Sequence, residues 1–124
     1  GTVASEVNLG TGINKMTNSG TVGGGIFAGN GTDTVTNTKL VKGNINLGHG
    51  ANSLTNLGTI EGAASFGVGN DTVVNEGTIM RYVDMFDGDN SLTNKGTIGE
   101  SIYSSVGNDT ITNPGIIKGD VHLG

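Results

Sequence analysis

The sequence of 124 residues contains no cysteine and no tryptophan, a single proline, and only 4% aromatic residues. Without cysteine the chain forms no disulfide, so a disulfide-stapled domain is excluded. With 33% hydrophobic residues in all, it cannot build a large globular core. Lys and Arg number only six against eleven Asp and Glu, and the net charge of −5 argues against nucleic acid as a partner. No apolar run is long enough to span a bilayer, so we expect no membrane insertion.

What the chain does have is repetition. One asparagine recurs at every nineteenth residue, and the segments between its occurrences align without a gap. A fixed short period is the sequence signature of a repeat architecture. We number each repeat from this Asn as position 1, and we call the residues that share a position a column. The asparagines are Asn18, Asn37, Asn56, Asn75, Asn94 and Asn113.

The apolar residues fall in fixed columns, at positions 5, 9, 11 and 18 of the repeat. Most of them are β-branched, and positions 5, 9 and 11 share one parity, as the alternation along a strand requires. We therefore predict an all-β fold, a single right-handed parallel β-helix (β-solenoid) with one repeat per coil and coils about 4.8 Å apart. We expect residues 1–124 to form one such domain of about six and a half coils. Because the chain begins and ends within a repeat, we expect a segment of a longer array without caps.

The two corners of each coil are marked by Asn and Gly. The Asn column predicts a ladder of side-chain amides, each bonded to the next. The motif Asn-x-Gly-Thr, as in Asn56–Thr59, and the run Asn113-Pro114-Gly115 predict a type II turn with positive φ at Gly, where Lys39 would be strained. A second Gly column, at position 14, is also expected at positive φ. Its members are Gly12, Gly31, Gly50, Gly69, Gly88 and Gly107.

A slower period is superimposed on the first. Position 16 alternates strictly between Asn and Asp, so the true unit is a pair of unlike coils, twice as long as the single repeat. A continuous column of Asp would place like charges side by side, which is unfavourable. The column reads Asn14, Asp33, Asn52, Asp71, Asn90 and Asp109. At position 7, which is otherwise small, Arg81 and Glu100 lie one coil apart and are expected to pair.

The stretch Gly67-Val68-Gly69-Asn70-Asp71-Thr72-Val73 resembles the G-x-G-x-D-x-U turn of calcium-binding RTX repeats, and residues 29–35 match as well. This resemblance implies calcium between successive coils. The candidate ligands are Asp33, Asp71, Asp87, Asp89 and Asp109. Because Asn52 and Asn90 occupy the intervening coils, each gap receives one carboxylate from this column, and plain turn geometry is the alternative. No other cofactor is expected.

The longer units G-N-D-T-V-V-N-E-G-T-I and D-N-S-L-T-N-K-G-T-I resemble the glycine- and asparagine-rich repeats in passenger regions of bacterial autotransporters and related surface adhesins. The resemblance covers the whole chain. It implies a β-helical stalk at the bacterial cell surface or secreted, with a structural and adhesive function. Catalysis is not expected, because His49 and His122 lie in different columns and the residues form no catalytic constellation.

Two outward faces differ in kind. Positions 17 and 19 form a Thr-x-Thr pattern, as in Thr34 and Thr36, which resembles the flat face of ice-binding β-solenoids. Ice binding is therefore one alternative function, and a calcium-stiffened RTX-like extender is another. The second face varies between coils and carries exposed aromatic residues, which suits recognition of a host or surface ligand. Its candidate residues are Phe27, Met80, Tyr82, Asp84, Tyr103 and His122.

The chain itself is a further expected partner. The first and last strands carry no proline block and no helix that would cover their open backbone edges. We therefore expect the isolated segment to associate end to end, as dimers or filaments.

Overall fold

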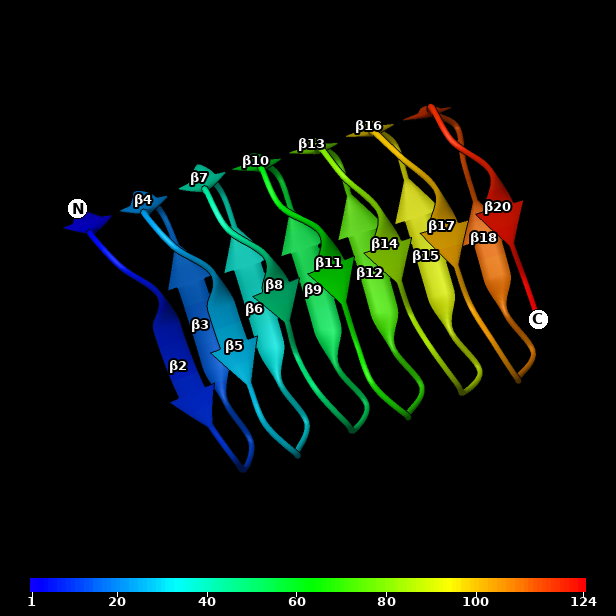
Figure 1. The fold of residues 1–124 in the computed structure, drawn as a ribbon, viewed down its shortest axis with the longest axis horizontal. Helices are drawn as coiled ribbons and strands as arrows, with labels where there is room; N and C mark the ends of the chain where they lie inside the picture. The colour runs from blue at the N-terminus through cyan, green and yellow to red at the C-terminus, as the bar shows by residue number, and fades with distance from the viewer.

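A computed structural model describes residues 1–124 and shows a parallel β-solenoid without helices. Successive coils follow one another along the long axis, with the two termini at opposite ends (Figure 1). The prediction of an all-β solenoid with one repeat per coil is confirmed, because each strand inside a sheet pairs with the equivalent strands of the repeats before and after it, as Val73 does with Leu54 and Leu92. No helix is present that is long and apolar enough to cross a membrane.

Each coil contributes one strand to each of three parallel sheets. The first sheet contains β1 (Thr2–Val3), β4 (Thr21–Val22), β7 (Leu40–Val41), β10 (Thr59–Ile60), β13 (Thr78–Ile79), β16 (Thr97–Ile98) and β19 (Ile116–Ile117). The second contains β2 (Val7–Gly10), β5 (Ile26–Ala28), β8 (Ile45–Asn46), β11 (Ala64–Ser65), β14 (Val83–Asp84), β17 (Ile102–Tyr103) and β20 (Val121–His122). The third contains β3 (Lys15–Asn18), β6 (Thr34–Asn37), β9 (Ser53–Asn56), β12 (Thr72–Asn75), β15 (Ser91–Asn94) and β18 (Thr110–Thr112).

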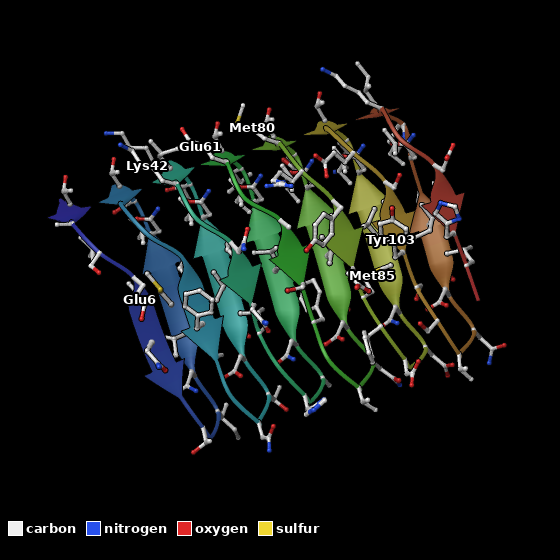
Figure 2. All side chains as sticks on the ribbon, viewed as in Figure 1. Glu6, Lys42, Glu61, Met80, Met85 and Tyr103 are labelled. Carbon is white, nitrogen blue, oxygen red and sulfur yellow. The ribbon has the colours of Figure 1, made fainter.

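The core is a set of apolar columns enclosed by the three sheets. A single cluster of 17 buried residues runs through the molecule, and the columns at positions 5, 9, 11 and 18 supply it, as predicted. Position 11 provides the larger members, Leu47, Phe66 and Met85. Residues at position 6 point the other way, and Figure 2 shows Lys42, Glu61 and Met80 projecting outward along one edge. The buried core therefore comes from these four columns, while apolar residues elsewhere in the repeat, such as Ile13 and Val106, stay exposed.

The predicted type II turn at Asn-x-Gly is wrong. Neither the glycines at position 3 nor Lys39 have a positive φ, so the strain expected at Lys39 is absent. The Asn side chain bonds within this turn instead. Asn18 Oδ1 accepts the Gly20 N–H at 3.1 Å, whereas Asn56 and Asn75 donate through Nδ2 to the carbonyls of Gly58 and Gly77 at 3.2 Å. Close stacking favours glycine here, although Lys39 fills the same position in one coil. A Cβ on Gly77 would collide with the carbonyl oxygen of Gly58 in the preceding coil.

The second corner agrees with its prediction. The six glycines at position 14 all have φ between 103° and 149°, a region that disfavours other residues. A Cβ on Gly69 would also collide with the Gly50 carbonyl oxygen of the coil before it. Both conformation and close stacking therefore require glycine at this position.

Candidate functional site

The asparagines at position 1 form a buried ladder of side-chain amides. Each Nδ2 donates to the Oδ1 of the next Asn at 2.7–2.9 Å along all five steps. Nδ2 also donates to a main-chain carbonyl of the next coil, as from Asn75 to Thr97 at 3.1 Å. The four central members, from Asn37 to Asn94, are fully buried. With donor and acceptor both used inside the stack, this column has a structural role and offers nothing to a ligand.

The column at position 16 forms a second ladder of a different kind. The main-chain N–H of each residue donates to the side-chain Oδ1 one coil further on, as from Asn52 to Asp71 at 2.8 Å and from Asp71 to Asn90 at 2.9 Å. The Asn52 Nδ2 group also donates to the carbonyl of Gly48 at 3.0 Å. In contrast, the Oδ2 atoms of Asp33 and Asp71 are buried without a partner. An unpaired buried oxygen of this kind is rare.

Burial therefore changes the acidity of Asp71. Desolvation raises its pKa from 3.8 to about 7, although hydrogen bonds from Asn52 act in the opposite direction. The raised pKa means that the folded chain binds a proton which the unfolded chain has already released above pH 3.8. The resulting stabilisation is complete below pH 3.8 and is lost as the pH rises to about 7.

This shift leads to the first testable prediction. Between pH 4 and pH 7 the free energy of unfolding should fall as the pH increases, and the Asp71→Asn variant should lose this part of the dependence. Above about pH 7 the variant should melt at a higher temperature than the natural chain, because the amide places no charge in the column. Thermal melts followed by circular dichroism across this range test the prediction. A higher melting temperature for the natural chain at pH 8 would contradict it.

The five candidate calcium ligands do not converge on one centre. Asp33 and Asp71 are buried in the position 16 ladder, where Oδ1 already accepts a main-chain N–H. Asp87 and Asp89 lie on the outside of the same corner and accept N–H groups of Val106 and Asn108. Asp109 accepts the Asn90 N–H at 3.0 Å. Calcium takes about six to eight oxygen ligands with several carboxylates, so these residues do not suit it, and its binding stays a prediction.

Only some of the residues predicted for the recognition face lie close together in the structure. The Tyr82 and Tyr103 rings lie edge to face with centroids 6.2 Å apart, and the ring of His122 stacks on Tyr103 at 5.1 Å. Figure 2 shows Tyr103 standing on the outer surface of the second sheet. We call Tyr82, Tyr103 and His122 the aromatic cluster. Phe27 belongs to β5, four coils from β17 and far from the cluster.

The remaining residues of this face have other surroundings. Asp84 lies beside Tyr103 in the strand register, but its Oδ1 atom accepts the Phe86 N–H at 3.1 Å, which gives it a structural role. Met80 is 53% exposed and follows β13 of the first sheet. The predicted pairing of Arg81 with Glu100 is confirmed at 3.7 Å, and because both side chains are largely exposed it stabilises the fold little.

The Thr-x-Thr face coincides with the third sheet. Its two outward columns are held in register, with Thr34 beside Ser53 and Thr36 beside Thr55. Val74 interrupts one column and Lys15 begins the other. Ice binding by this face stays a prediction, as does end-to-end association of the chain.

Sequence reasoning missed one set of residues at the second corner. Asn8, Asn46 and Asp84, all at position 10, accept the main-chain N–H two residues ahead. From residue 8 to residue 103, position 10 alternates between this group and the residues Phe27, Ser65 and Tyr103, and this alternation is visible in the sequence, whereas His122 in the last, partial coil departs from it.

The structure contains no pocket. Comparison of the chain with models of protein families, with curated proteins and with solved structures found no match. The solenoid fold therefore rests on the structure, and the likenesses to surface adhesins and RTX repeats rest on the repeat motifs.

Proposed function

We propose that the chain is a structural and adhesive repeat module of an exported bacterial surface protein, a rigid stalk that presents the aromatic cluster to a ligand. Two buried ladders and a continuous apolar core support the structural part of this role. They join every coil to its neighbours over the whole length, as in other solenoids whose stability is the sum of repeat and interface terms.

The aromatic cluster is the single observation that carries the adhesive part. Three rings gather on the outside of the rod, with Tyr82 edge to face against Tyr103 and His122 stacked on Tyr103. Tyr103 is 42% exposed although it has two ring partners, so much of its surface remains available. Tyr is enriched at the centres of binding interfaces because it offers a large rigid surface with a polar end.

Adhesion is tested with beads that carry the purified chain. We expect them to bind to at least one member of a panel of immobilised oligosaccharides and extracellular matrix proteins, and not to albumin. Tyr103→Ala should weaken that binding about tenfold or more, since interface hot spots contribute roughly 2 kcal/mol each. Thr55→Ala on the third sheet is the matched control, and it should leave binding unchanged.

Two outcomes would overturn the proposal. One is binding no stronger than that to albumin across the whole panel. The other is binding that Tyr103→Ala leaves intact while Thr55→Ala removes it, which would move the site to the Thr-x-Thr face. Export needs a separate test. Antibodies against the chain should label intact cells of the producing bacterium.

A further inference from the structure

The second corner of the solenoid has two conformations that alternate from coil to coil. In coils with Asn at position 16, which we call Asn coils, the residue at position 12 has a left-handed conformation. These residues are Gly10, Gly48 and Phe86, with φ of 72°, 67° and 59°. Their N–H groups donate to the side chains of Asn8, Asn46 and Asp84 at 2.9–3.1 Å. Each Asn coil therefore satisfies this N–H within itself.

The other coils, with Asp at position 16, are built differently, and we call them Asp coils. Their residues at position 12 are Gly29, Gly67 and Ser105, and none of these has a positive φ. The N–H groups instead donate across the stack to the carbonyls of Gly10, Gly48 and Phe86 at 2.8–2.9 Å. An Asp coil therefore needs the carbonyl of an Asn coil beneath it.

The two corners are complementary. The carbonyl of Gly48 in an Asn coil receives the Gly67 N–H, whereas no N–H of the chain donates to the carbonyls of Gly29 and Gly67. The equivalent N–H groups of the following coils, those of Gly48 and Phe86, already donate to the side chains of Asn46 and Asp84. The position 16 ladder adds a second constraint, because adjacent Asp coils would place buried carboxyl groups one coil apart, about 4.8 Å.

We infer that the alternating corner is a register lock, which lets this chain, or a second copy pairing with it, be shortened, extended or joined only in steps of two coils. In this lock, the residue at position 10 has a different role in each kind of coil. Position 10 of an Asn coil must carry an Asn or Asp side chain, which accepts the N–H of position 12. In Asp coils, Phe27, Ser65 and Tyr103 accept no such N–H. Large side chains on this part of the surface are therefore tolerated on alternate coils.

Deletion of whole coils tests the lock. Removing residues 38–56 takes out one Asn coil and brings Asp33 against Asp71, whereas removing residues 38–75 takes out a pair and preserves the alternation. In an ordinary solenoid each coil adds stability, so the shorter chain should melt first. The lock predicts the reverse order, with the chain lacking 38–75 melting several degrees above the chain lacking 38–56. Melting temperatures that follow length alone would overturn the inference.

Two point variants of the full chain test the register lock even if neither deletion variant folds. Asn46→Ala removes the acceptor of the Gly48 N–H, while Ser65→Ala alters the same position one coil later, where no cap exists. Asn46→Ala should lower the melting temperature by a few degrees, and Ser65→Ala should leave it within about 1 °C. Equal effects of the two variants would show that the corners do not differ in function and would overturn the lock.

Discussion

Ile79→Asp is expected to unfold the middle coils, with a loss of more than about 4 kcal/mol in the free energy of unfolding. Ile79 is 0% exposed and lies in a column between Ile60 and Ile98, one coil away on either side. A carboxylate at this point would be dehydrated without a partner. Because each coil is supported only by its neighbours, the damage should spread in both directions. Denaturant titration followed by circular dichroism measures the loss.

The matched control is the next residue. Met80→Asp places the same charge at a side chain that is 53% exposed and points away from the core, so we expect a change within about 0.5 kcal/mol. Amide hydrogen exchange would locate the damage, with loss of protection in β10, β13 and β16 for the Ile79 variant only. Equal destabilisation by both variants would mean that the inward and outward columns are wrongly assigned.

The columns could be predicted from the sequence because the period has no gaps. Every repeat has the same length, so a wrong repeat length would have displaced the predicted columns in all later coils. In the structure, equivalent strands of successive repeats are neighbours in each sheet, as the period predicts. The apolar residues are few, but most of them fall in columns that the strands turn inward, as Val22 and Leu54 show, while others such as Ile13 and Val106 stay exposed. Register in a solenoid is therefore a property of the period, and local strand propensity only has to agree with it.

The error at Asn-x-Gly has a physical origin. Turn rules connect Gly with positive φ inside an isolated turn, but in a solenoid each residue also lies on the coil before it. At Gly20 and Gly58 a Cβ would collide with the backbone of the preceding coil, although Lys39 occupies the same position in the coil between them. Steric exclusion by another coil and conformational demand select the same amino acid, so the sequence alone could not distinguish them. At position 14 both causes act, and there the prediction is confirmed.

The candidate site was predictable to a lesser extent. Tyr103 and His122 share a column, so the period already places them one coil apart, but the contact of Tyr82 with Tyr103 joins position 8 of one coil to position 10 of the next and does not follow from the period. Asp84 is predicted as part of a recognition surface, whereas in the structure it caps a corner. That role depends on the left-handed conformation of Phe86, a bulky residue for which positive φ is unusual. Alternation at position 10 was the one signal that pointed to it.

The second large effect is expected at the centre of the Asn ladder. Asn75 accepts a hydrogen bond from Asn56 at 2.8 Å and donates to Asn94 at 2.8 Å. It also donates to the carbonyls of Gly77 and Thr97, at 3.2 and 3.1 Å. The side chain is fully buried, so water cannot replace these partners. One substitution at this position therefore leaves several polar groups unsatisfied.

Asn75→Ala should lower the free energy of unfolding by about 3 kcal/mol, since the Oδ1 atom of Asn94 loses its donor and a cavity opens beside it. Asn75→Asp keeps nearly the same shape but directs an oxygen where the amide donated. At neutral pH it should be at least as damaging, and part of its loss should be recovered under acid, where a protonated carboxyl group donates again.

Asn113 offers the control within the same column. It accepts from Asn94 at 2.7 Å but is exposed at the end of the ladder, so water can satisfy the groups that Asn113→Ala would free. We expect this variant to lose no more than about 1 kcal/mol. Urea titrations of the three variants at pH 5 and pH 7.5 provide the comparison. If Asn113→Ala were as damaging as Asn75→Ala, the asparagines would act mainly as turn formers, because that role is the same in every coil whereas burial of the ladder is not.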